Sequence, residues 1–179
     1  MEPGRSSGDP APAPATAIHR LVERCRAQDH PGKVARLLSG WVVMGDPQPF
    51  PGYCLLLPDP VVAHLNALAG AARAQFLADM ALTGDAVLAC TGAVRVNYAL
   101  FGNVEPALHA HVIPRQADEP AAQRSAHPWA IDWSAAPAYG AALHEGLRAR
   151  IAAYLEAHGG AALGAGAERS GGAELKGRP

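Results

Sequence analysis

The strongest constraint on the fold is a pair of short apolar runs that only two residues separate. Val34–Leu38 and Trp41–Met44 are mostly apolar, and Ser39 and Gly40 lie between them. A two-residue connection that ends in glycine is typical of a tight β-hairpin. A third apolar run, Tyr53–Leu57, follows a loop that is rich in proline. The three runs predict neighbouring antiparallel strands, joined in the order of the chain.

Two apolar runs later in the chain predict two more strands. These are Val94–Phe101 and Leu108–Pro114, and the segment Gly102–Ala107 joins them. Together with the earlier runs they predict an antiparallel sheet of about five strands. A sheet of this kind with helices beside it defines the α+β class.

Helices are predicted on both sides of the strand regions. Residues 18–28 place apolar side chains at the spacing of one helical face. A helical region runs from residue 59 to about residue 91, with a break near Gly70. An alanine-rich last helix starts at Ser134 or Pro137. Its predicted apolar face is Leu143, Leu147, Ile151 and Leu155.

Length and composition predict one folded domain between two tails. The chain has 179 residues, of which 49% are hydrophobic and 17% are charged. Residues 1–16 and 159–179 are rich in small residues and proline, so we expect disordered tails there and a folded domain at 17–158. The 15 basic and 16 acidic residues nearly balance. This balance argues against nucleic acid or a membrane surface as a partner.

The cysteines and the absence of long apolar stretches predict a cytoplasmic protein. Cys25, Cys54 and Cys90 are odd in number, lie far apart and form no CxxC pair. This pattern argues against a disulfide framework and against a cysteine zinc site. The sequence has neither an 18-residue apolar run nor the apolar core of a signal peptide.

Two histidines on one predicted strand are the candidate catalytic residues. His109 and His111 are two residues apart, so their side chains project from the same face, while Leu108, Ala110 and Val112 face the core. Paired imidazoles bind a metal or handle a phosphoryl group. A metal would need further ligands, and the other histidines show no recognisable ligand spacing with this pair. Two polar residues on a solvated sheet face are the simplest alternative.

The surroundings of this pair resemble the histidine triad family. The family signature alternates three histidines with apolar residues, and here Ala107-Leu-His109-Ala-His111-Val-Ile-Pro-Arg115 has an alanine at the first histidine position. Val42-Val-Met-Gly-Asp46 and Pro51-Gly-Tyr-Cys-Leu-Leu-Leu-Pro58 look like the nucleotide-binding strand pair of that family. Asn97-Tyr98 and Gly102-Asn-Val-Glu-Pro106 resemble the dinucleoside-polyphosphate-hydrolase-like branch. The resemblance covers about residues 34 to 133.

This resemblance implies a nucleotide hydrolase or nucleotidyl transferase of the HIT-like fold. His109 would attack the α-phosphorus of a nucleoside 5′-phosphate derivative such as a dinucleoside polyphosphate, and water would cleave the covalent nucleotidyl-histidine. His111 would donate to phosphate oxygens or to the departing group. The resemblance implies a homodimer and requires neither metal nor cofactor. The residues expected to bind the nucleotide substrate are Asn97, Asn103, Asp46, Gly102 and Arg115.

Two departures from the family pattern define the alternatives. Ala107 cannot orient His109 through a side chain, so a backbone carbonyl is the expected substitute. Asp59-Pro60-Val61 stands where many relatives have lysine and histidine, which removes positive charge from the phosphate side. A phosphorylase, a phosphoramidase and a nucleotide-binding protein without catalysis are therefore alternatives, and a metal-binding module is a weaker one. Trp129 and Trp133 are expected either to cover the site or to pack in the core or a dimer contact.

Overall fold

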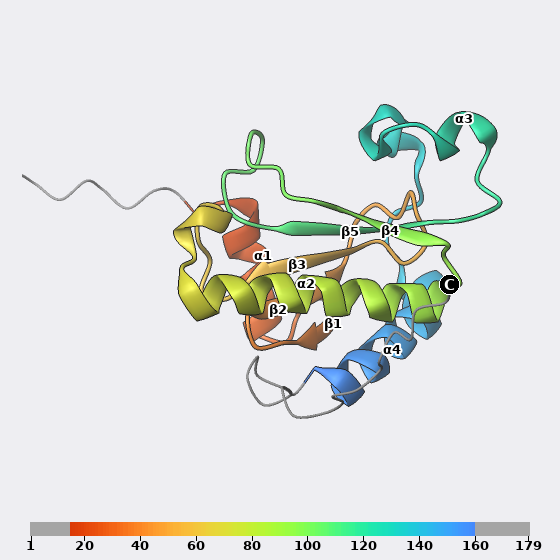
Figure 1. The fold of residues 1–179 in the computed structure, drawn as a ribbon. Coiled ribbons are helices and arrows are strands. Elements are labelled where there is room, and N and C mark those ends of the chain that lie inside the picture. The colour runs from red at the N-terminus through yellow and green to blue at the C-terminus, as the bar shows by residue number, and fades with distance from the viewer. Residues whose placement is uncertain (1–14, 160–179) are drawn as a thin grey trace, which may run out of the picture.

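The computed structural model describes residues 15–159, which form a sheet with helices on both of its faces (Figure 1). The predicted tails at 1–16 and 159–179 lie almost entirely outside these residues. The exceptions include Thr16, whose hydroxyl caps the first helix by accepting from the backbone N–H of His19. The elements in chain order are α1 (Ala17–Arg26), β1 (Lys33–Arg36), β2 (Gly40–Met44), β3 (Cys54–Pro58), α2 (Gly70–Thr91), β4 (Arg95–Ala99), β5 (Ala110–Arg115), α3 (Ala121–Arg124) and α4 (Ala141–His158).

The five strands form one antiparallel sheet in the order β1-β2-β3-β5-β4. This confirms the predicted α+β class and the five-stranded sheet. The β1–β2 hairpin closes at Gly40, where a side chain would overlap the carbonyl oxygen of Leu57 in β3. The register places His111 of β5 between Leu55 of β3 and Ala99 of β4. The histidine strand therefore lies inside the sheet, with a strand on each side.

The two faces of the sheet have different coverings. Helices α2 and α4 pack on one face, and Figure 1 shows α2 in front of the strands with α4 beside it. The main core lies there and includes Val42, Leu56, Ala110 and Val112. Helix α1 covers part of the opposite face through Ile18, Val22 and Cys25, over Trp41, Val43 and Leu57. The remaining part of that face carries the histidines.

The helix predicted from residue 59 begins later, at Gly70. Residues 59–69 contain only a single 3₁₀ turn, Leu65–Ala67. The backbone of this segment is bonded to other elements: Asp59 donates its N–H to the carbonyl of Ser39, and Val62 accepts from Leu108. These bonds tie Asp59 and Val62 to neighbouring segments, and no α-helix forms over 59–69, so a helix there was a wrong prediction.

The last helix also begins later than predicted, at Ala141. The chain before it is bonded to the loop after β2, because Gln48 donates to the carbonyl of Pro137 and Tyr139 donates its N–H to Asp46. Leu143 is 77% exposed, whereas Ile151 and Leu155 are buried. A step of four residues turns 40° around a helix, so this apolar stripe winds away from the core.

Candidate active site

His109 is buried immediately before β5, and a backbone carbonyl orients its ring. Its Nδ1 lies 2.8 Å from the carbonyl oxygen of Ala107. A carbonyl oxygen only accepts hydrogen bonds, so the proton of the neutral imidazole sits on Nδ1. The lone pair is therefore on Nε2. The backbone of Ala107 thus makes the contact expected in place of a histidine side chain.

The neighbouring His111 has the opposite tautomer because of a tyrosine. The hydroxyl of Tyr53 lies 2.6 Å from His111 Nδ1. Burial raises the pKa of Tyr53, so its hydroxyl keeps its proton. Among residues 15–159 this hydroxyl has no other hydrogen-bond partner than Nδ1, so we assign the hydroxyl as the donor. Burial first, and then the nearby His109, lower the pKa of His111 to about 4. His111 is therefore neutral at pH 7, with its remaining N–H on Nε2.

The place of Tyr53 depends on a glycine in the neighbouring segment. A Cβ atom at Gly45 would lie 2.1 Å from atoms of the Tyr53 ring, so only glycine leaves room for that ring. The ring stacks on His111 with centroids 5.9 Å apart and planes at 9°. Tyr53 is a functional candidate that the sequence reasoning missed. The sequence feature that could have identified it is a hydroxyl-bearing residue at the start of the apolar run 53–57, whose strand pairs with the strand of His111.

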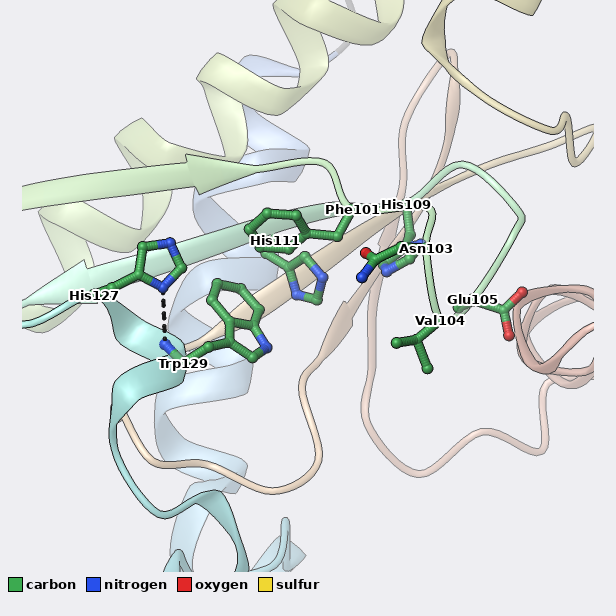
Figure 2. A pocket seen from close by; sticks show the side chains of 8 residues that line it. All are labelled: Phe101, Asn103, Val104, Glu105, His109, His111, His127 and Trp129. Carbon is green, nitrogen blue, oxygen red and sulfur yellow. Dashed lines mark hydrogen bonds between the residues drawn. The ribbon is translucent and has the colours of Figure 1, made fainter.

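Both histidines open into a cavity of about 460 Å³ (Figure 2). Their rings are 4.8 Å apart between centroids, with planes at 71°. Trp129 forms one wall and meets His111 edge to face, with centroids 4.8 Å apart. Phe101 meets Trp129 in the same way at 4.8 Å. The other lining residues are Asn103, Val104, Glu105 and His127.

The aromatic wall is supported from behind by a second tryptophan. Trp133 stacks on Trp129 with centroids 5.3 Å apart and planes at 20°. Its indole N–H donates to the carbonyl of Pro128 at 2.8 Å, and its ring packs on Phe50 and Tyr53. The two tryptophans were expected either to cover the site or to pack in the core. Trp129 covers the site, and Trp133 packs in a small core beside it.

The predicted nucleotide-binding residues do not all reach this cavity. Asn103 lines it, and Gly102 lines an adjoining cavity of about 290 Å³ that also contacts His109. Asn97 pairs with Ile113 in the sheet and lines other hollows, behind Trp129 and beside Arg115. The structure therefore brings Asn103 and Gly102 to the histidines and leaves Asn97 outside.

Arg115 is occupied by internal contacts instead of facing the cavity. Its guanidinium is buried and donates to both carboxylate oxygens of Glu119, with distances of 2.6–3.0 Å. It also donates to the carbonyl of Gln123 at 2.6 Å. Because these partners use its donors, Arg115 anchors the segment after β5 and is not placed to bind substrate.

Asp46 lies in a separate cavity of about 240 Å³ on the same face of the sheet. One carboxylate oxygen, Oδ1, accepts from the backbone N–H of Tyr139 at 2.9 Å. Apolar residues of this cavity include Leu21 of α1 and Leu55 of β3, and Leu55 is the cross-strand partner of His111. The cavity of Asp46 is therefore a neighbour of the histidine pair.

Within residues 15–159, no cluster of three or more histidine, cysteine or acidic side chains is arranged to hold a metal ion. In the same range, no helix is long and apolar enough to span a membrane. What this site offers chemically is one imidazole lone pair on His109, one imidazole N–H on His111, and an aromatic wall.

The fold is that of the histidine triad proteins. A histidine triad protein from Marinobacter aquaeolei VT8 matches with a TM-score of 0.63 and 20% identity, over 80% of this chain and 98% of that one. One from Sinorhizobium meliloti 1021 matches with a TM-score of 0.62 and 21% identity, over 78% and 97%. A hypothetical histidine triad nucleotide-binding protein from Sulfolobus tokodaii strain7 matches with a TM-score of 0.60 and 14% identity, over 77% and 92%. No family model and no curated protein matches the chain.

Proposed function

We propose that this protein is a nucleotide hydrolase or nucleotidyl transferase with His109 as its nucleophile. The observation that carries the proposal is the 2.8 Å contact between His109 Nδ1 and the carbonyl of Ala107. It fixes the lone pair on Nε2, which is what an attack on phosphorus requires. The fold it shares with a nucleotide-binding protein from Sulfolobus supports a nucleotide as the substrate.

The proposed reaction has two displacement steps at one phosphorus. First, His109 Nε2 forms a bond to the α-phosphorus of a nucleoside 5′-phosphate derivative, and the bond from phosphorus to the leaving group breaks. The leaving group keeps that electron pair and takes a proton from water. The remaining hydroxide then attacks phosphorus and breaks the bond to Nε2, which releases the nucleoside monophosphate. His111 Nε2–H donates to a phosphate oxygen or to the leaving atom.

The cavity beside the histidines is the proposed place of the nucleoside. Asp46 has one carboxylate oxygen bonded to Tyr139, and its second oxygen can accept from a ribose hydroxyl. Leu21 and Leu55 offer apolar surface to the base. Asn103 binds phosphate through its neutral amide. This placement puts the α-phosphorus between the Asp46 cavity and the cavity that Trp129 lines.

A nucleotide-binding protein without catalysis is the second candidate. Ala107 favours it, because the side chain that the family pattern has at this position is missing. The two candidates differ in one measurable property, the release of nucleoside monophosphate. A phosphorylase or a phosphoramidase would use the same nucleophile and differ in the acceptor or the leaving group.

The deciding experiment uses metal-free protein with diadenosine tetraphosphate and with adenosine 5′-phosphoramidate, and follows the products by chromatography. We expect release of AMP from at least one substrate. The variant His109→Ala loses this release but keeps its affinity for nucleotide within about tenfold, because other residues bind the nucleotide. Full turnover by His109→Ala would exclude His109 as the nucleophile. Binding without release by the wild type would establish the second candidate.

A further inference from the structure

We propose that a second hollow of the molecule, at the end of the sheet where β4 begins and β5 ends, binds a phosphate group. This hollow has a volume of about 360 Å³, and neither His109 nor His111 lines it. The proposal is therefore independent of the proposed function. We call the hollow the arginine hollow; its polar lining residues are Arg95, Asn97, Arg115, Gln116, Glu119, Arg124 and Ser125.

The lining of the arginine hollow carries more positive than negative charge. Three arginines line it, and Glu119 is the single acidic residue. The carboxylate of Glu119 is bonded to Arg115 and also accepts from the backbone N–H of Gln116 at 2.7 Å. Within residues 15–159, neither Arg95 nor Arg124 forms an ion pair. The charges of these two arginines are therefore not offset in that part of the chain.

The register of the sheet adds to this unbalanced charge. Arg95 of β4 is the cross-strand partner of Arg115 of β5. Like charges directly opposite one another in an antiparallel pair are unfavourable, and Glu119 carries only one negative charge against the three arginines. An anion held by Arg95 and Arg124 lowers the electrostatic energy of the group.

Neutral hydrogen-bonding groups complete the lining. In the part of the chain that the structure describes, the side chains of Asn97, Gln116 and Ser125 have no hydrogen-bond partner. Amide and hydroxyl groups of this kind bind phosphate oxygens and add no charge. Asn97 is two residues from Arg95 on β4, so both side chains project from the same face of the sheet. The hollow thus combines two free charges with three free neutral groups.

The types of these residues favour phosphate over a carboxylate. The planar fork of a guanidinium matches the oxygens of a phosphate, and such pairs are frequently bidentate. A phosphate ester carries about two negative charges at pH 7, which equals the number of unpaired arginines, whereas a carboxylate carries one. Asn97 and Arg115, which were expected to bind nucleotide beside the histidines, both lie in this hollow instead. Arg115 holds its wall through Glu119, and Asn97 faces the ligand.

A phosphate in the arginine hollow would link the sheet to the segment that carries the aromatic wall. Arg95 and Asn97 belong to β4, whereas Arg124 ends α3 and Ser125 follows it. Trp129, which lines the histidine cavity, is four residues after Ser125. A ligand bound by both parts ties this segment to β4, so it should slow the local opening of the segment.

Calorimetric titration with inorganic phosphate, at constant ionic strength, tests the site. We expect Arg95→Gln and Arg124→Gln each to weaken binding by at least about tenfold, because each change removes a charged hydrogen-bond donor. Arg73→Gln is the matched control and keeps the affinity of the wild type. Arg73 is exposed on α2 and forms no ion pair within residues 15–159. Equal affinities of the wild type and Arg95→Gln would overturn the proposal.

Two further comparisons test the assignment to phosphate. Arg95→Lys keeps the charge and loses the fork, so its affinity should lie between those of the wild type and Arg95→Gln. Acetate carries a single charge and should bind the wild type at least about tenfold more weakly than phosphate. Equal affinities for acetate and phosphate would show that the hollow does not select phosphate.

Amide NMR signals separate this site from the histidine cavity. Added phosphate should shift the signals of residues 94–97 and 116–126 in the wild type but not in Arg95→Gln. Shifts confined to residues near His109 would place the phosphate at the histidines and overturn the proposal. Because no turnover is measured, a failure of the wild type to release AMP contradicts the proposed function and leaves this test unaffected.

Hydrogen exchange measures the link to the aromatic wall. Bound phosphate should slow the exchange of backbone amides in residues 120–130 of the wild type, whereas the same concentration leaves Arg95→Gln unchanged. Unchanged exchange in this segment of the wild type, with phosphate bound, would overturn the link between the hollow and Trp129.

Discussion

Ala107 shows how a backbone atom replaces a missing side chain. Its carbonyl oxygen orients the ring of His109, the proposed nucleophile, and this atom is present whatever the residue is. Its methyl group is 2% exposed and packs with Val22, Trp41 and Leu57 beneath α1. The position is therefore part of a small apolar core, at the wall of the adjoining cavity of about 290 Å³.

This packing predicts what happens when position 107 receives the first histidine of the family signature. Ala107→His adds a polar ring to a small apolar core and is expected to destabilise the protein by about 1–3 kcal/mol, with no gain in kcat. Urea unfolding measures the first effect, and release of AMP measures the second. A variant with unchanged stability and tenfold higher kcat would show that the carbonyl of Ala107 orients His109 poorly.

The lowered pKa of His111 predicts a dependence of stability on pH. The folded protein holds this group at a pKa of about 4, below its ordinary value of 6.5, so between these values only the unfolded chain takes up the proton. The free energy of unfolding is therefore highest above pH 6.5 and falls as the pH drops toward 4. This group contributes up to about 3 kcal/mol to the fall.

Urea titrations of the wild type and of His111→Gln at pH 4.5 and pH 7 measure this contribution. The variant lacks the titrating group, so its free energy of unfolding should change less between the two pH values, by about 2–3 kcal/mol. His64→Gln replaces an exposed histidine and serves as the control. Its free energy of unfolding should change between the two pH values by the same amount as that of the wild type. Equal changes in His111→Gln and the wild type would contradict the buried, neutral state of His111.

At the scale of elements, the strand pair β2–β3 sets the tautomer of a histidine on β5. Gly45 follows β2 and makes room for the Tyr53 ring, and Tyr53 precedes β3 and donates to His111. Two residues at the ends of the β2–β3 connection therefore act on one imidazole of β5. The segment after β5 acts in a similar way, because Arg115 anchors it and it carries Trp129 to the cavity.

Gly45→Ala is expected to disturb this arrangement. The added methyl group would lie 2.1 Å from the Tyr53 ring, so the ring must move and its hydrogen bond to His111 is lost. We expect kcat to fall about tenfold, as for Tyr53→Phe, which removes the same donor but keeps the ring. Tyr53→Phe and the double variant provide the comparison: additive losses of the two changes would show that Gly45 does not act through Tyr53.

At the scale of the whole molecule, β4 is one of the two edges of the sheet, and within residues 15–159 no strand pairs with its outer side. Strand β4 is at the end of the strand order, and Tyr98 on it is 42% exposed. Tyr98 contacts Gly84 of α2, and Leu77, two turns earlier on the same helix face, is 39% exposed. An unpaired edge beside exposed apolar residues favours association with another copy of the chain.

We therefore predict a homodimer that forms through β4 and α2. Light scattering on the wild type should give twice the mass of one chain. Leu77→Glu places a charge beside this edge and should shift the mass toward the monomer. Leu143→Glu, on α4, is a matched change at a 77% exposed leucine and should leave the dimer intact. A monomeric wild type at micromolar concentration would contradict the prediction.

The sequence by itself determined the strands, the class of the fold and the two candidate catalytic residues. The Ser39-Gly40 turn and the alternation around His109 and His111 are local patterns, and local patterns fix strands and the face of a side chain. Helix starts were less predictable, because the segments before Gly70 and Ala141 are bonded to other parts of the chain.

Only the tertiary structure decided the partners of the site residues. Tyr53 and Trp129 lie far from the histidines in sequence and reach them through the sheet register and the anchored segment after β5. Arg115 is bonded to Glu119, and neither Asn97 nor Asp46 lines the histidine cavity. A residue pattern states which groups are available, whereas burial and hydrogen-bond partners decide which atom carries the proton and which side chain meets the substrate.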